Sequence, residues 1–142
     1  MDSARLNPAS MYSAPDPASL TRLVHEFYAD VRRDPLLAAV FGPRIGGDWD
    51  AHLDRMVAFW SDVMLGRSAG VPGFQGNVYG KHMTLEGVTP EHFRRWLNLF
   101  DATARRLFAP PVADELLVVA KRIAASLQYG FFGKVEVAGP DA

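Results

Sequence analysis

The stretch DWDAHLDRMVAFWSDVML (48–65) predicts one long amphipathic helix that begins after a possible cap at Asp48. Apolar residues recur along it at helical spacing in two neighbouring rows, so the apolar face is wide. A face of this width predicts burial against more than one neighbouring element. One row consists of Trp49, Leu53, Met56, Trp60 and Met64, and beside it lie His52, Met56, Phe59 and Val63.

Proline next to a capping or chain-breaking residue marks the ends of the other helices. These marks lie at Asp16-Pro17, Asp34-Pro35, Thr89-Pro90 and Pro110-Pro111. We expect the last helix to end near Gly130, and a short apolar segment, 36–41, to stop at Gly42-Pro43. The sequence shows no strand alternation, hairpin signal or internal repeat. It predicts an all-α fold of about four long helices plus short pieces.

Composition limits the class of protein. The chain has 142 residues, of which 49% are hydrophobic and 22% are charged, with a net charge of −1. These values predict a single globular domain over residues 16–133, between a mobile N-terminal tail (1–15) and a C-terminal tail (134–142). No basic stripe for nucleic acid is present. The longest apolar run, 36–41, is too short to cross a membrane, and no signal-peptide core is seen, so we expect a cytoplasmic protein.

Several catalytic and metal-binding motifs are missing. The chain contains no cysteine, which excludes disulfides, a cysteine nucleophile, an iron–sulfur cluster and covalent haem attachment through C-x-x-C-H. It has no Glu-x-x-His pair for a di-iron bundle and no H-E-x-x-H zinc motif. It also lacks a phosphate loop and a G-x-S-x-G nucleophile elbow.

Two histidines are the main candidates for chemistry. His52 lies on the apolar helix described above, and His82 follows a glycine-rich stretch, 66–80, that holds five of the twelve glycines. A structureless stretch of this length inside a compact domain is usually functional or disordered. One imidazole from a helix and one after a loop, in an aromatic helical chain, suggest a pocket for haem. The residues alone leave open that His82 is an ordinary loop histidine.

For three further residues, the sequence allows either a functional role or simple burial in the core. His52 is either a satisfied interior histidine or a distal group that contacts a bound diatomic molecule. Tyr28 and Trp96 are either core aromatics or hydrogen-bond donors to that ligand. His25 and His92 are predicted to face solvent, and we assign no role to them.

Four stretches together resemble the group III branch of the truncated haemoglobins. They are EFYADVRRDPLLAAVF (26–41), WDAHLDRMVAFW (49–60), FQGNVYGKHMTL (74–85) and HFRRWLNLF (92–100). Each is modest alone, but their order and spacing are specific. The resemblance extends over residues 20–132, which is most of the chain.

The resemblance implies a two-over-two helical sandwich around haem b, with the proximal helix largely replaced by a loop. It implies His82 as the iron ligand and a distal side formed by Tyr28, His52 and Trp96. The remaining haem contacts that it implies are Phe41 as a wedge, Arg55 towards a propionate, and Phe27, Met56 and Phe93 as apolar wall.

The resemblance also implies O2, NO, CO or peroxide as ligands. Donors aimed at bound oxygen in an apolar pocket stabilise its partial negative charge. Each net hydrogen bond contributes roughly 0.5–1.5 kcal/mol, so two donors slow oxygen release about ten- to a hundredfold. Two classes of function remain open. One is redox catalysis, such as NO dioxygenation or peroxide chemistry, supported by a separate reductase because no flavin or nicotinamide motif is present. The other is non-catalytic oxygen storage, delivery or sensing.

Overall fold

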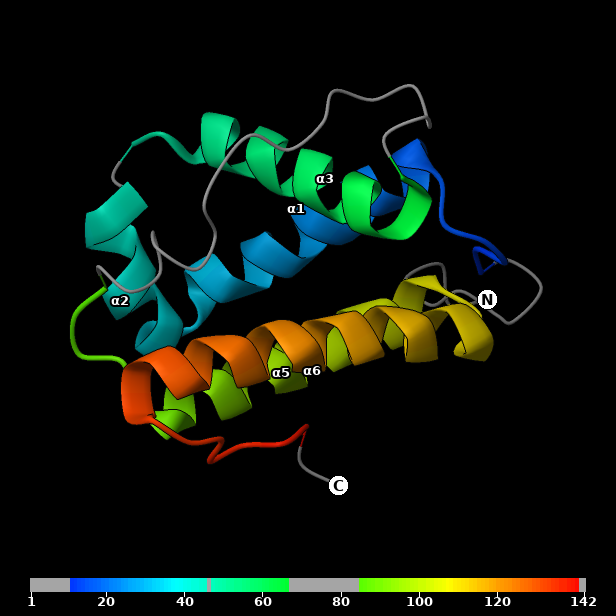
Figure 1. Cartoon of the computed structure of the whole chain (residues 1–142). Coiled ribbons are helices and arrows are strands. Elements are labelled where there is room, and N and C mark those ends of the chain that lie inside the picture. Colours follow the sequence, from blue (N-terminus) through cyan, green and yellow to red (C-terminus); the bar gives the residue numbers. More distant parts are fainter. Residues whose placement is uncertain (1–10, 46, 67–84, 141–142) are drawn as a thin grey trace, which may run out of the picture.

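The computed structural model describes residues 11–45, 47–66 and 85–140, and all of its regular elements are helices (Figure 1). They are α1 (Pro17–Arg33), α2 (Pro35–Ile45), α3 (Trp49–Leu65), α5 (Pro90–Leu107) and α6 (Pro110–Phe132). No strand occurs in these ranges, and the only pairing of β type there is an isolated bridge between Tyr12 and Phe108. The predicted all-α fold is therefore confirmed.

The helices form two layers. In Figure 1, α1 and α3 lie together on one side and α5 and α6 lie together on the other. The most extensive contacts are between α5 and α6, between α1 and α3, and between α1 and α5, which joins the layers. The short helix α2 lies at one end and contacts both α1 and α5. This is the two-over-two arrangement expected from the sequence.

Local sequence accounts for the start of α1. The Ser19 amide donates to Asp16 Oδ1 at 2.7 Å, and the Asp16 amide donates to Ser19 Oγ at 2.9 Å. This reciprocal capping box satisfies two backbone N–H groups at the helix start, and Pro17 has no N–H to satisfy. Asp34 ends the helix as expected.

The cap expected at Asp48 does not form. Asp48 precedes α3, but its side chain makes no capping hydrogen bond. Its backbone, at φ −100° and ψ 43°, lies outside the extended region in which an N-cap side chain reaches the first turn. The prediction of the helix is right, and the prediction of its cap is wrong.

Two helices also end at residues other than those predicted from the sequence. Helix α2 does not stop at Gly42-Pro43 but continues to Ile45. Proline removes one backbone donor, and here only the last two residues of a short helix follow it. Helix α6 passes Gly130 and ends at Phe132, because Gly133 takes the left-handed conformation, with φ +73°. Glycine accepts this conformation without a steric penalty, so Gly133 is the true stop signal.

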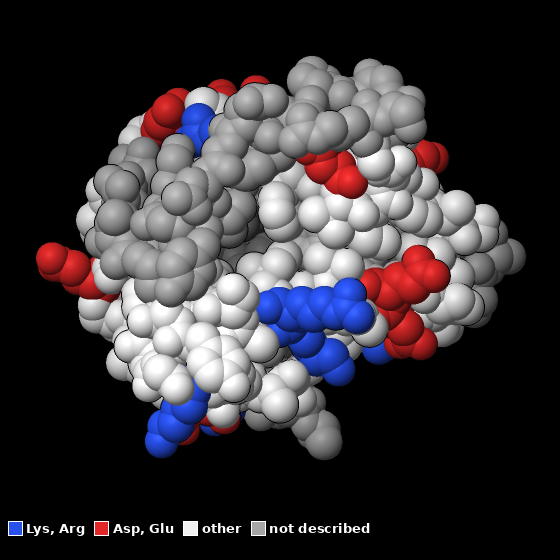
Figure 2. All heavy atoms as spheres, in the orientation of Figure 1, with Lys and Arg blue, Asp and Glu red and all other residues white. Residues whose placement is uncertain are grey.

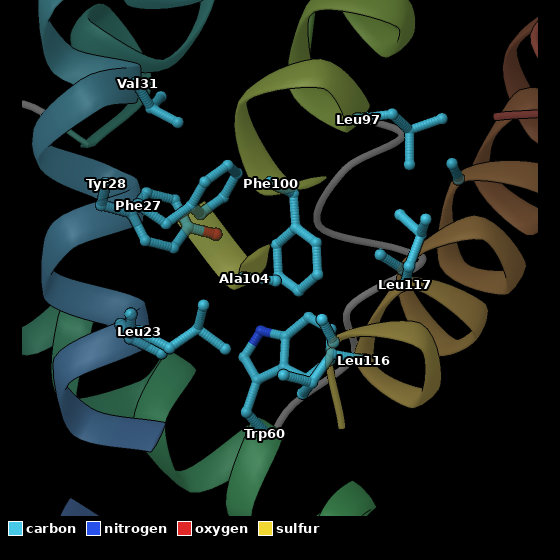
Figure 3. Close-up of a cluster of buried hydrophobic side chains, with 14 of the residues drawn as sticks. Leu23, Phe27, Tyr28, Val31, Trp60, Leu97, Phe100, Ala104, Leu116 and Leu117 are labelled. Atoms are coloured by element: carbon cyan, nitrogen blue, oxygen red, sulfur yellow. The ribbon is translucent and has the colours of Figure 1, made fainter. Parts of the chain in front are cut away.

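The core lies between the two layers and is rich in aromatic rings (Figure 3). Phe100 of α5 is stacked on Trp60 of α3 at 5.1 Å between ring centroids. It meets Phe27 of α1 edge to face at 5.4 Å. Val63, expected in an interior row, is 45% exposed, so the apolar face of α3 is narrower than the sequence suggested.

Both segments assigned to the tails contact the helices. The Tyr12 amide donates to the Leu107 carbonyl at 3.0 Å, and the Ala109 amide donates to the Tyr12 carbonyl at 2.9 Å. Near the other end, the buried Gln128 side chain donates to the Val137 carbonyl at 2.8 Å and accepts from the Val137 amide at 2.9 Å. Across the described ranges, no helix is both long and apolar enough to span a membrane.

Candidate functional site

A cavity lies between the two layers, with about 760 Å³ of empty space that includes its opening to solvent. Figure 2 shows that this face of the molecule is hollowed between the layers. Small-molecule and cofactor sites are typically concave and mostly apolar. This hollow is therefore a candidate site for a small molecule or a cofactor.

Every described helix contributes to the wall, and the contribution is mainly aromatic or aliphatic. The wall includes Leu37, Val40 and Phe41 from α2, Met56, Phe59 and Trp60 from α3, Phe93 and Trp96 from α5, and Ile123, Leu127 and Phe131 from α6. Among the described residues, no acidic side chain and no lysine or arginine lines it. Such a wall favours a broad apolar ligand over a hydrated ion.

Tyr28 of α1 places a buried hydroxyl at this cavity. The residue is 7% exposed and lines the wall, and Figure 3 shows its hydroxyl pointing away from α1 towards the interior. Among the described residues it has no hydrogen-bond partner. Burial raises the pKa of Tyr28, so the group stays protonated and can act as a donor. A hydroxyl at a cavity wall without a protein partner can donate to a ligand or a water.

Trp96 of α5 faces the same cavity and is held in place from two sides. Its ring is stacked on Phe100 at 5.8 Å and meets Phe27 edge to face at 5.6 Å. These contacts fix the orientation of a half-buried indole that lines the wall. Tyr28 and Trp96, both predicted distal residues, are thus brought together at one cavity.

His52 lies close to Tyr28 but is not part of the cavity wall. Its ring meets Tyr28 edge to face at 5.2 Å and Trp49 at 5.6 Å, and its Nε2 is inaccessible to solvent. The Arg32 guanidinium covers the outer Trp49 ring at 4.6 Å from the centroid. The structure therefore groups His52 with Tyr28 and Trp49, and His52 is not among the residues that line the described cavity.

The other predicted site residues fall into four groups. Phe41, Met56 and Phe93 line the cavity. Phe27 does not line it but supports Tyr28, with ring centroids 5.0 Å apart. Arg55 is exposed on α3 and is absent from the wall. His82 lies outside the described residues.

His92 is a cavity residue that the sequence interpretation missed. It was predicted to face solvent, yet it is half-buried and lines the wall. It lies three residues after Thr89 and four before Trp96. Residues four apart share a helix face, so the position of Trp96 was the available signal.

One half-buried carboxylate connects two walls of the cavity. Asp34 Oδ2 accepts from the Arg95 guanidinium of α5 at 2.8 Å, while Oδ1 accepts from the Leu36 and Leu37 amides at the start of α2 at 3.0 and 3.1 Å. Partial burial alone would raise the pKa of Asp34, but the Leu37 amide and Arg95 outweigh it and the pKa is lowered. The carboxylate stays ionised and fixes α2 against α5.

The donor set of the described residues does not suit a bare metal ion. No group of three or more histidine, cysteine or acidic side chains in those residues could hold one. The apolar wall and the buried Tyr28 hydroxyl fit a flat apolar cofactor with a polar ligand above it. The residues present are therefore compatible with haem.

Comparisons with known proteins agree with this fold. No family model matches the chain. The curated group 3 truncated haemoglobin Ctb of Campylobacter jejuni is 28% identical over 113 residues, covering 78% of this chain and 86% of that protein. The crystal structure of group III truncated haemoglobin from Campylobacter jejuni superposes with a TM-score of 0.76 and 27% identity, covering 83% of this chain and 92% of that one. The chain is therefore similar in sequence to a group III truncated haemoglobin and has the truncated globin fold.

Proposed function

We propose that the chain binds haem b non-covalently in this cavity and there binds O2 and other diatomic ligands reversibly. The carrying observation is the buried Tyr28 hydroxyl, which meets an apolar cavity and has no partner among the described residues. A haem bound there supplies an iron atom to which a diatomic gas can bind. The protein supplies a dry cavity and the donors around the ligand.

The walls of the cavity support the cofactor by packing. Phe41 of α2, Met56 of α3 and Phe93 of α5 come from three different helices and meet at one space. Burial of apolar area contributes about 25 cal/mol per Å², so a broad ring gains most where every side is apolar. The bond to iron is assigned to His82 by the family resemblance.

Tyr28 and Trp96 act on the gaseous ligand in this proposal. With haem bound, the protonated Tyr28 hydroxyl would donate a hydrogen bond to a diatomic ligand that carries negative charge, and would stabilise that charge. The low dielectric of the apolar wall strengthens the interaction, because little water competes for the donor. The raised pKa of Tyr28 ensures that its proton remains available at neutral pH.

Strong retention of oxygen favours chemistry or sensing over transport. In the catalytic form of the proposal the bound ligand is O2, NO or peroxide, and a separate reductase restores the cofactor. In the non-catalytic form the protein stores, delivers or senses a diatomic ligand. Sustained turnover in the presence of a reductase would support the first, and tight binding without turnover would support the second.

A visible absorption spectrum tests the proposal directly. The purified protein, loaded with haem, is measured in the ferric state, after reduction with dithionite, and after addition of carbon monoxide. We expect an intense Soret band that shifts at both steps. A colourless protein that takes up no added haem would refute haem binding.

Tyr28→Phe should keep haem and speed oxygen dissociation about tenfold, the equivalent of one hydrogen bond of roughly 1.4 kcal/mol. Trp96→Phe should change the rate in the same direction, because it removes the indole N–H and keeps a smaller aromatic ring at the wall. Stopped-flow displacement of oxygen by carbon monoxide measures the rates. Tyr129→Phe is the matched control, since Tyr129 is 63% exposed. Unchanged rates in both cavity variants would contradict the distal assignment.

A further inference from the structure

His92 is the one imidazole that lines the cavity within the described part of the chain. It stands in the first turn of α5, next to Phe93 and one turn before Trp96. The other polar side chains of the wall, Tyr28 and the indoles of Trp60 and Trp96, lie among apolar neighbours. His92 is half-buried, so it combines a cavity position with access to solvent.

One ring nitrogen of His92 is already engaged, and this determines what the other can do. The backbone amide of Thr89 donates to Nδ1 at 3.0 Å, and the Thr89 hydroxyl oxygen lies 2.9 Å from the same atom. A backbone N–H can only donate, so Nδ1 acts as the acceptor and carries no proton. The proton of the neutral ring is then on Nε2, which makes no hydrogen bond to any described residue.

The capping role explains Nδ1 but not the placement of the ring on the cavity wall. A donor at the edge of an apolar cavity matches a ligand that is apolar over most of its area and carries an acceptor at its rim. Haem has this character, because its ring is apolar and its two propionates are carboxylates. A carboxylate needs hydrogen-bond partners when it leaves water, and access to solvent at His92 allows its second oxygen to stay hydrated.

We infer that His92 Nε2 donates a hydrogen bond to a carboxylate of the bound cofactor. This inference rests on the proposed haem function. It adds a second binding residue to Arg55, which the family resemblance directs towards a propionate. Arg55 itself is exposed on α3 and is not part of the described wall. His92 is already fixed by Thr89, so little side-chain entropy is lost when the carboxylate binds.

His92→Gln tests the inference, because glutamine at this position can still accept from the Thr89 amide in a capping box while it removes the ring N–H. The haem-loaded variant is mixed with excess apomyoglobin, and the rate of haem transfer is followed by absorbance. We expect transfer about tenfold faster than from the wild-type protein, as for loss of one hydrogen bond to a charged group. His25→Gln, at an exposed position of α1, should leave the rate unchanged.

The same measurement with haem dimethyl ester separates carboxylate binding from packing. The ester has no charged carboxylate, so the wild-type protein and His92→Gln should lose it at the same rate. Acceleration of both cofactors by an equal factor would overturn the inference and leave His92 a structural residue. An unchanged rate for native haem would also overturn it. A wild-type protein without a Soret band would instead refute the proposed function itself.

Discussion

Replacing His82 with alanine is expected to leave a protein that cannot retain haem through purification. The described cavity wall offers one imidazole, His92, and the Nδ1 atom of that ring is bonded to Thr89. His52 contacts Tyr28 and is not among the residues of the described wall. The family resemblance assigns the iron bond to His82, and its removal leaves packing alone to hold the cofactor. The ratio of Soret to protein absorbance after gel filtration measures the loss.

Rescue with free imidazole sharpens this test. Imidazole added to His82→Ala should restore a stable Soret band, because the missing ligand is replaced in the space left by the side chain. His25→Ala is the control, and it should retain haem like the wild-type protein, since His25 is exposed on α1. If His82→Ala keeps its haem and His52→Ala loses it, the iron ligand has been assigned to the wrong histidine.

The helix boundaries that could be predicted from sequence are those set by local chemistry. Asp16 and Ser19 form a capping box within four residues, and Thr89 with Pro90 starts α5 as expected. A capping signal depends only on residues within one helical turn, so packing against the other helix layer does not change it. The Asp48 cap failed because its backbone leaves the extended region, which the sequence does not reveal.

The sequence could indicate which residues line the cavity where the residue type was distinctive, but not where helix packing decides which side chains are exposed. Tyr28 and Trp96 were singled out as polar groups on apolar faces, and both line the cavity. His92 was missed because it follows Glu91 at the start of a helix, and its exposure depends on how α5 packs against the rest of the molecule. Arg55 shows the converse, since its position near His52 in sequence does not bring it to the described wall.

Phe100→Ala is expected to destabilise the fold by about 3–5 kcal/mol, the usual cost of truncating a fully buried phenylalanine. Phe100 is 1% exposed and contacts three rings, with Trp60 at 5.1 Å and Trp96 at 5.8 Å both stacked on it. Their lost contacts add to the transfer cost, since the surrounding helices cannot close the space completely. Typical domains are stable by only about 5–15 kcal/mol, so the loss is a large fraction of the total.

Urea unfolding of the haem-free and haem-loaded forms measures this loss and relates it to the cavity. Tyr129→Ala removes an aromatic ring of similar size that is 63% exposed, and it should change the free energy of unfolding by less than about 1 kcal/mol. Trp96 rests on Phe100, so Phe100→Ala also removes the support of one cavity wall. Haem binding should then be weaker in the variant, and the stabilisation that added haem provides should be smaller than in the wild-type protein. Equal stabilisation of both proteins by haem would show that the cavity does not depend on the stacked rings of Trp60, Phe100 and Trp96.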